Sequence, residues 1–495
     1  MARPTSKVKT PGSRLDRVGW SALGYAPFRF FIVAMLASTS GNFVYYAALG
    51  WYVLEVTGSA AAVGFAFTAS GLPILFLTPH AGVLTDRLGA RAMLLISLAG
   101  MAVVTIVQAV LAIGGAPPYA LVVVLALGLG IAQTIGAPAS VAIVNELVPP
   151  PAVSSATALN FLHMNLARII GGLIGGLLLA TTTPAIAFTA AAILFTAPVL
   201  ILWQVRTPAS AGPADDRSRG AIVGPLVEAF RYASRYPTLG VLIVLSIAPG
   251  AIGLSYIFML PVAADELGIG AAGLGVLMAA SGFGGLVAGL SLESIQRRIG
   301  HGKALFGGMV GAAIGLTSFG LAPSVPLAIA TLTIVGASFL TFAAANVTLI
   351  QALAPARLRG RMVSLFATLY WGMMPIGALL VGLVAEATTA RIAIALCGIG
   401  LVIAGTAAFV VRPQIATLSV GRDGLTLSGD LQGSGVERPS PLPGAVPGDA
   451  PAFLPRPKVT SPMGAERTDL TEASAPAETR AQAEPTNEPV DAAAR

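Results

Sequence analysis

Twelve apolar runs of about twenty residues, spread over a chain of 495 residues, constrain the fold more than any other feature. At 1.5 Å per helical residue, each run is long enough to cross a hydrocarbon layer of about 30 Å. Only helices and closed barrels satisfy their backbone in lipid, and these runs lack the alternation of barrel strands. We therefore predict an all-α polytopic membrane protein. Its spans lie near residues 30–54, 60–79, 92–113, 118–142, 156–180, 184–204, 239–262, 270–292, 304–322, 326–348, 363–385 and 391–411.

The composition agrees with a membrane protein and argues against several kinds of site. Hydrophobic residues make up 55% of the chain and charged residues only 10%, against about a quarter in soluble proteins. Cys397 is the only cysteine, so neither an internal disulfide nor a cysteine metal site can form. His80, His163 and His301 are too far apart in sequence to suggest a metal site. With no Walker A loop and no intramembrane acid pair, we expect neither an enzyme nor a cofactor.

The net charge of +7 invites a nucleic-acid interpretation, but the distribution of charge argues against it. Arginine and lysine are concentrated in the N-terminal arm and in the even-numbered connections between spans, whereas the odd-numbered connections hold only Arg391. Positively charged loops stay in the cytoplasm. We therefore expect a multi-pass protein of the bacterial cytoplasmic (inner) membrane, with both termini cytoplasmic, the lipid bilayer as its surroundings and no nucleic-acid partner. We expect it to act as a monomer.

The spans divide into two sets of six, which resemble a weak internal repeat. Leu147, Pro149 and Gly176 recur as Leu353, Pro355 and Gly382, each at an offset of about 206 residues. Two pseudo-symmetric six-helix bundles would place a substrate site between them, near the bilayer midplane. The predicted organisation is a cytoplasmic arm (1–28), an N-terminal bundle (29–204), a cytoplasmic linker (205–238), a C-terminal bundle (239–411) and a disordered cytoplasmic tail (412–495).

A compact charged segment, GVLTDRLGAR (82–91), separates the second and third runs. Its pattern resembles the G-x-L-x-D-R-x-G-R signature loop of the major facilitator superfamily, which implies that family's fold and transport by alternating access. By the geometry of that family, the carboxylate would hold the two halves together when the cytoplasmic side is shut, opposite arginines that precede the eleventh span. The alternative is a positive loop that serves topology alone. The predicted gating residues are Gly82, Asp86, Arg87, Gly89, Arg91, Arg359 and Arg361.

The segments GNFVYYAALGWYVLEVTGS (41–59), NELVP (145–149) and LRGRMVSL (358–365) are similar to the drug and siderophore exporters of that superfamily, the group that contains enterobactin exporters. The fifth span also resembles the antiporter motif G-P-x-x-G-G. Its glycines are Gly171, Gly172, Gly175 and Gly176, with Gly172 in place of the proline. The chain further departs from proton-coupled relatives in Asn42, where an aspartate is frequent, and in LGLG (127–130), which lacks an arginine.

Arg168 is the only arginine well inside a predicted span, where a charge costs about 3 kcal/mol or more. We expect it to face the central cavity and contact substrate or an anion; the alternative is a structural pairing. Breaks at Gly41 and at Pro249–Gly250, in corresponding spans, point to the same place. The other predicted cavity residues are Asn42, Tyr45, Gln133, Asn160, His163, Tyr256, Asn346, Tyr370 and Trp371.

An aromatic cavity with little charge suits a small amphipathic organic molecule better than an ion. Our first hypothesis is therefore an efflux transporter of drug-like or siderophore-like compounds, working by proton antiport. An importer of a nutrient or a cofactor such as a vitamin is the alternative on the same fold. A non-transporting membrane scaffold is a third possibility. Substrate identity cannot be read from the sequence.

Overall fold

The computed structural model describes residues 20–204, 224–421 and 424–427, and almost all of this part is helical. It contains twelve helical segments long and apolar enough to span a membrane, which confirms the predicted fold class. The first six are α2 (Ala26–Thr57), α3 (Ala60–Leu88), α4 (Ala90–Gly114), α5 (Tyr119–Leu147), α6 (Val153–Thr181) and α7 (Pro184–Gln204). The last six are α9–α10 (Pro237–Leu245 and Tyr256–Glu266), α11 (Gly270–Ile299), α12 (His301–Gly320), α13 (Val325–Leu353), α14–α15 (Arg359–Gly372 and Met374–Ala387) and α16 (Ala390–Val411).

Short elements connect and flank the spans. They are η1 (Ser21–Gly24), η2 (Pro150–Ala152), α8 (Gly224–Arg235), the π-helical turn η4 (Pro249–Gly253), η5 (Ala356–Leu358), η6 (Pro413–Thr417), and the strands β1 (Leu418–Gly421) and β2 (Gly424–Leu427). The helix α8 lies within the predicted linker. Residues 205–223 of that linker and the tail beyond residue 427 lie outside the described residues.

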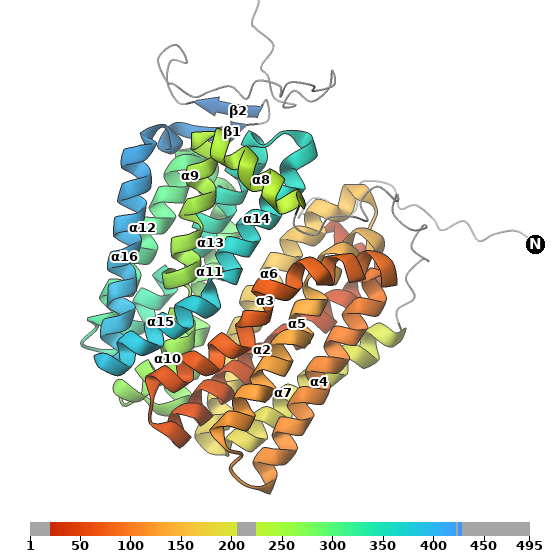
Figure 1. The fold of residues 1–495 in the computed structure, drawn as a ribbon, viewed down its shortest axis with the longest axis vertical. Helices are drawn as coiled ribbons and strands as arrows, with labels where there is room; N and C mark the ends of the chain where they lie inside the picture. Colours follow the sequence, from red (N-terminus) through yellow and green to blue (C-terminus); the bar gives the residue numbers. More distant parts are fainter. Residues whose placement is uncertain (1–19, 205–223, 422–423, 428–495) are drawn as a thin grey trace, which may run out of the picture. The chain divides into compact units, whose positions relative to one another are not determined.

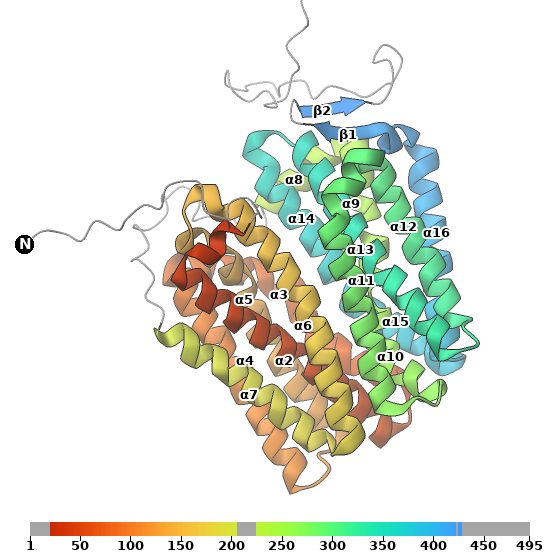
Figure 2. The ribbon, with the colours of Figure 1, turned by 180° about the vertical axis from the view of Figure 1, so that it is seen from behind.

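Helices pack mainly with members of their own set of six (Figures 1 and 2). In the first set α2 packs on α6 and α7, and α5 on α3 and α4; in the second, α12 packs on α13 and α16. The largest contacts between the sets are those of α6 with α11 and of α3 with α15, and α10 also contacts α2 and α3. Lipid removes most of the hydrophobic drive between helices, so close packing of small residues has to hold these contacts together.

One-residue turns connect two pairs of spans at the same end of the molecule. Gly89 lies between α3 and α4 with φ of +86°, and Gly300 lies between α11 and α12 with φ of +85°. Glycine is the residue that adopts such angles without a steric cost. We call this end the Gly89 end and the opposite one, where α2 stops before Gly58, the Gly58 end. The expectation of a loop over residues 82–91 was wrong, because helix α3 continues to Leu88.

The predicted break in span 7 is present and the one in span 1 is not. Helix α9 stops at Leu245, and the chain passes through the π-helical turn Pro249–Gly253 before α10 begins. In contrast, α2 runs unbroken through Gly41, because Gly41 serves packing: a Cβ there would lie 2.9 Å from that of Leu194 in α7. A glycine in an apolar run therefore did not mark a break.

The chain after α16 folds back onto the Gly89 end, so the prediction of a disordered tail from residue 412 was wrong for Pro413–Gly421 and Gly424–Leu427. Ile415 and Leu418 are buried, and the strands β1 and β2 pair antiparallel from Leu418 opposite Leu427. The backbone N–H of Val420 donates to Nδ1 of His301 at 3.1 Å. These contacts fix the end of α12, the span that follows the second one-residue turn.

Candidate functional site

Glycines bring α6 and α11 into backbone contact between the two sets of spans. A Cβ on Gly176 would lie 2.6 Å from the Cα of Gly275, and one on Gly172 would lie 2.7 Å from the Cβ of Met278. The two other glycines of the motif face a different way: Gly171 and Gly175 pack on α2 of their own set. The four glycines of the predicted motif therefore serve two different surfaces, and the position that departs from the family motif, Gly172, lies between the sets.

The contact of α3 with α15 uses the same kind of packing. A Cβ on Gly64 would lie 2.5 Å from the carbonyl oxygen of Ala378, and Thr68 donates its hydroxyl to the carbonyl oxygen of Pro375 at 2.7 Å. Nearer the Gly58 end, the carboxylate of Glu386 accepts hydrogen bonds from Ser59 Oγ at 3.0 Å and from the N–H of Ala61 at 3.1 Å. An acidic side chain of α15 thus caps the N-terminus of α3, where helix dipole and free N–H groups favour it.

Three aromatic rings fill the space between α2, α3 and α10. Phe67 stacks on Phe258 with centroids 4.4 Å apart, and Tyr46 meets Phe67 and Phe258 edge-on at 5.6 and 5.8 Å. We call these three residues the aromatic cluster. It lies about 10–16 Å from the Gly58 ends of its helices, at 1.5 Å per residue. These three residues were not predicted from the sequence, because aromatic residues on separate spans have no common pattern in the chain.

At the Gly89 end the charged residues have other partners than those expected from the sequence. Asp86 and Arg87 are exposed, and no other described residue forms an ion pair with Asp86. Arg357 and Arg361 instead pair with Glu228 of α8, the former at 3.5 Å. Since the expected contact belongs to a state closed at this end, the gating role of Asp86 stays a prediction.

The two other arginines predicted at the gate bind backbone carbonyls. Arg359 Nε donates to the carbonyl oxygen of Ala354 at 3.4 Å, before its own helix. Arg91 Nη2 donates to the carbonyl oxygen of Trp203 at 2.9 Å, at the C-terminus of α7. A cation at that position is favoured by the free carbonyls and the helix dipole. In this conformation Arg91 therefore stabilises its own set of spans.

Arg168 lies near the middle of α6, about 20 Å from either end at 1.5 Å per residue. Its Nη1 donates to Ser281 Oγ of α11 at 3.2 Å, and its guanidinium carbon lies 5.3 Å from the ring centroid of Phe43 in α2. Ser281 Oγ shares a short hydrogen bond with the hydroxyl of Tyr256 in α10. These contacts place Arg168 beside α11 and α2, one helical turn from the glycine contact at Gly172, and its predicted role in the central cavity stays a prediction.

The remaining predicted residues of the second set lie at different depths. Tyr256 and Tyr370 are buried, Tyr256 beside Phe339 and Tyr370 stacked on Phe366. Trp371 is 40% exposed and adjoins Gly372, a position that faces Leu75 of α3. Its ring meets that of Tyr370 edge-on, with centroids 5.1 Å apart.

The polar residues predicted to line the cavity in the first set lie on α2, α5 and α6. Asn42, Gln133 and Asn160 are half-buried, and Tyr46 donates to Gln133 Oε1 at 3.4 Å. His163 is buried, with Nε2 3.3 Å from Thr39 Oγ1.

Two of the predicted cavity residues are oriented away from this interface. Tyr45 is fully buried within the first set, where its hydroxyl donates to Gln108 Oε1 at 3.0 Å and its ring packs on Phe188. Asn346 is fully buried within the second set and donates to Ser246 Oγ at 3.0 Å. Both predictions of a cavity position were wrong, because a polar atom inside a span can be satisfied within its own bundle.

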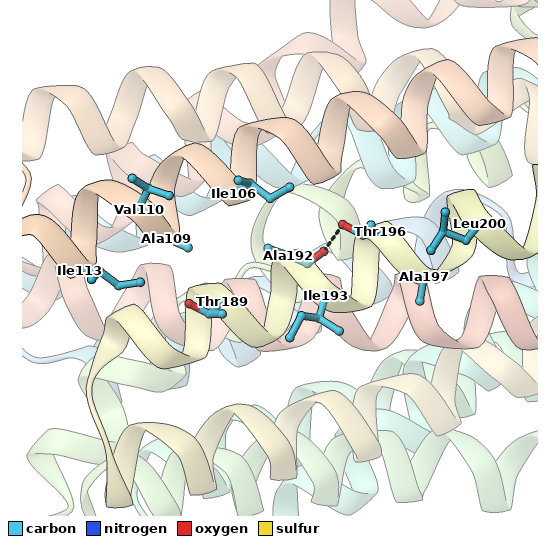
Figure 3. Close-up of a pocket in the computed structure, with 10 residues that line it drawn as sticks. All are labelled: Ile106, Ala109, Val110, Ile113, Thr189, Ala192, Ile193, Thr196, Ala197 and Leu200. Atoms are coloured by element: carbon cyan, nitrogen blue, oxygen red, sulfur yellow. Dashed lines mark hydrogen bonds between the residues drawn. The ribbon is translucent and has the colours of Figure 1, made fainter.

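A groove elsewhere on the first set is apolar. It encloses about 390 Å³ between α4 and α7, and Ile106, Val110 and Ile193 line it (Figure 3). The hydroxyl of Thr196 in this groove donates a hydrogen bond to the carbonyl oxygen of Ala192, four residues earlier in the same helix. None of the predicted cavity residues lines this groove, and its exposed Ile and Val side chains suit lipid chains.

Comparison with known proteins identifies relatives over most of the chain. A family model described as transmembrane secretion effector matches residues 17–419. The multidrug efflux pump Tap of Mycolicibacterium fortuitum is 28% identical over 380 residues, which cover 73% of this chain and 90% of Tap. The enterobactin exporter EntS of Shigella flexneri is 25% identical over 361 residues, covering 73% and 85%. A staphyloferrin A transporter of Staphylococcus aureus is 25% identical over 274 residues, covering 55% and 68%.

Solved structures share the fold at low identity. The nucleoside transporter NupG superposes with a TM-score of 0.61 at 14% identity, over 78% of this chain and 99% of NupG. A bacterial homolog of the human lysosomal transporter Spinster, inward-facing and unoccupied, gives 0.61 at 15% identity, over 78% and 97%. Together with the twelve spans and the family match, these results show that the chain belongs to the transmembrane secretion effector family of the major facilitator superfamily and is a membrane transporter, not an enzyme.

Proposed function

We propose that this protein exports small amphipathic organic compounds from the bacterial cytoplasm by alternating access, with proton antiport as the driving reaction. The Gly89 end is the cytoplasmic end in this proposal, because the arginines and lysines between spans concentrate there. Relatives described as a multidrug efflux pump and as an enterobactin exporter support export and the class of cargo.

The position of the contacts between the two sets of spans carries the proposal. Glycine contacts, the aromatic cluster and the Glu386 cap all lie between the middle of the spans and the Gly58 end. At the Gly89 end, Asp86 is exposed and the arginines before α14 bind Glu228. Alternating access requires that, in each state, the two sets of spans are in contact at one end of the molecule and not at the other. In the opposite state, the Gly58 end separates and Asp86 approaches the second set.

Partly buried aromatic and amide side chains support the class of substrate. Tyr46, Gln133 and Trp371 offer ring faces and hydrogen-bond donors in an otherwise apolar region. Such a mixture binds compounds with an apolar body and a few polar groups.

Flux in membrane vesicles of both orientations tests this proposal. Inside-out vesicles with the protein should accumulate dyes and siderophores from a panel when acidified inside, and nigericin should abolish the accumulation by removing the pH gradient. Vesicles without the protein and vesicles with Asp86→Asn serve as controls. Accumulation in right-side-out vesicles alone would establish import instead. Flux that valinomycin with potassium stops and nigericin does not would exclude proton antiport.

A further inference from the structure

The uncompensated charge of Arg168 is the feature that the proposed function leaves unexplained. All acidic residues of the described spans lie within about two turns of a helix end. Arg168, in contrast, lies in the middle of α6 and has no carboxylate partner among the described residues. Because arginine stays charged even in a membrane, this position carries a permanent positive charge that no carboxylate among the described residues neutralises.

The contacts of Arg168 leave most of its hydrogen-bonding capacity unused. A guanidinium has five N–H donors, and the described residues accept only one hydrogen bond from it, at Ser281 Oγ. Its Nε is buried without any partner. Unpaired buried donors are costly, and more so on a charged group. The planar arrangement of the free donors matches two oxygens of one carboxylate.

The neighbours of Arg168 are aromatic. Phe43 lies under its guanidinium at 5.3 Å, and the hydroxyl of Tyr256 reaches it through Ser281. Tyr370 of α14 lies within electrostatic range of the same charge. A ligand whose anionic group replaced Ser281 at the guanidinium would find ring surfaces within reach for an apolar body.

We infer that Arg168 is the recognition point for a carboxylate on an aromatic or otherwise apolar substrate, with Ser281 and Tyr256 completing the hydrogen bonds. This inference rests on the proposed transport function and narrows its substrate class to organic anions. It also connects binding to movement. The hydrogen bond from Arg168 to Ser281 joins α6 to α11, so a carboxylate that takes up this donor removes a contact between the two sets of spans.

Matched pairs of ligands test the inference by direct binding. The full-length protein in nanodiscs is titrated with 1-naphthylacetic acid, indole-3-acetic acid and 4-biphenylacetic acid, and with the neutral amide of each, and tryptophan fluorescence is recorded. For at least one pair we expect the acid to bind about tenfold more tightly than its amide, because hydrogen bonds to a charged group are the stronger ones. If no acid binds up to its solubility limit, or if the amides bind equally well, the inference is overturned.

Substitutions assign that preference to one residue. Arg168→Gln should abolish the difference between acid and amide and leave binding of the amide unchanged within about twofold. Arg297→Gln is the matched control, since Arg297 is exposed and pairs only with Glu293 four residues earlier, and it should keep the preference. Arg168→Lys retains the charge without the planar fork and should retain only part of the preference. This variant decides the question if Arg168→Gln does not fold: a preference as large as in the wild type would overturn the inference.

The outcome is separable from that of the vesicle experiments. Binding in nanodiscs needs no gradient, so a preference for acids that depends on Arg168 would stand even if the vesicles showed import. Conversely, export of neutral dyes by Arg168→Gln, together with equal binding of acids and amides by the wild type, would leave the proposed function intact and remove this inference.

Discussion

Asp86 lies three residues before the one-residue turn at Gly89, and Glu293 lies seven residues before the corresponding turn at Gly300. Their surroundings differ. Glu293 pairs with Arg297 within the same helix, and both side chains are largely exposed. Asp86 has no such partner among the described residues, although Arg87 follows it directly. In the proposed mechanism, the exposed carboxylate of Asp86 is available for a contact in the opposite state, whereas a carboxylate paired within its own helix is not.

Replacement of Asp86 should therefore affect transport and leave insertion intact. We expect Asp86→Asn to lower flux at least about tenfold at equal protein level, through loss of a charge-assisted hydrogen bond in the closed state of the Gly89 end. Glu293→Gln should retain flux close to wild type. Flux is measured in inside-out vesicles, with the amount of protein determined by immunoblot. Wild-type flux in Asp86→Asn would remove this residue from the gate.

Substitution of Gly82 and of Gly89, the two glycines of the signature segment, should affect stability differently. Gly89 has a positive φ, so Gly89→Ala should destabilise the protein by about 1–2 kcal/mol. Gly82 is helical, and a Cβ there would have no neighbour within 4 Å, so Gly82→Ala should be neutral or stabilising. Thermal unfolding in detergent measures the difference. Equal loss of stability in both variants would contradict the assignment of the turn to Gly89.

Helix α6 packs closely against two helices through glycines on two of its faces. Gly171 and Gly175 set its distance from α2 within one set of spans, and Gly172 and Gly176 set its distance from α11 in the other. Only the second pair lies between parts that alternating access has to separate. In the proposed mechanism, α6 keeps its contact with α2 and separates from α11. The glycines of the two contacts are adjacent in sequence, Gly171 beside Gly172 and Gly175 beside Gly176.

A methyl group at the contact between α6 and α11 should slow transport, whereas one at an open position of α12 should not. Gly176→Ala places a Cβ 2.6 Å from the backbone of Gly275 and should disfavour closure of the Gly58 end, slowing transport severalfold. Gly307→Ala on α12, where a Cβ would meet nothing within 4 Å, is the control and should transport normally. Flux relative to protein amount in vesicles measures both. Normal flux in Gly176→Ala would show that α6 and α11 need not approach this closely.

The elements were the most predictable part of this structure, and the orientation of side chains was the least. Lipid imposes length and polarity on each span, so the sequence alone was sufficient for the twelve helices and for the break at Pro249–Gly250. Tyr45 and Tyr46 are adjacent, and both are aromatic residues with a hydroxyl, but only Tyr46 faces the second set. Which of two neighbours points inward depends on the rotation of the helix, and a span apolar all round has no hydrophobic face to reveal it. The hairpin after α16 was missed because its stabilising contacts are with α12, far away in sequence.

In the proposed mechanism, the structure is one state of a pair. The contacts between the two sets of spans consist of backbone packing, three aromatic rings and a few hydrogen bonds. Contacts of this kind would permit two arrangements separated by a few kcal/mol, which is what a transporter needs to switch. Each contact that exists only with the Gly58 end closed should therefore shift the balance when it is removed.

Substitution of Glu386 tests how one contact between the two sets affects the equilibrium between the two states. Its carboxylate on α15 caps the N-terminus of α3 across the two sets, and Glu386→Gln removes the charge from this cap. An exposed charge at a helix N-terminus contributes about 0.3–1 kcal/mol, so the population open at the Gly58 end should rise about two- to fivefold. The matched control is Glu266→Gln. Glu266 caps the N-terminus of α16 through Ala390 and Arg391, and both partners belong to the same set of spans.

Distances between spin labels report this shift without a substrate. Labels at Val56 and Thr388 measure separation at the Gly58 end, in a background where Cys397, the one native cysteine, is replaced by serine. Glu386→Gln should enlarge the long-distance component of the distribution. Glu266→Gln should leave the distribution as in the parent protein, because its cap stays within one rigid set whichever end is open. Equal shifts in the two variants would mean that helix caps at this end act through general stability, and the cap between α15 and α3 would then have no part in gating.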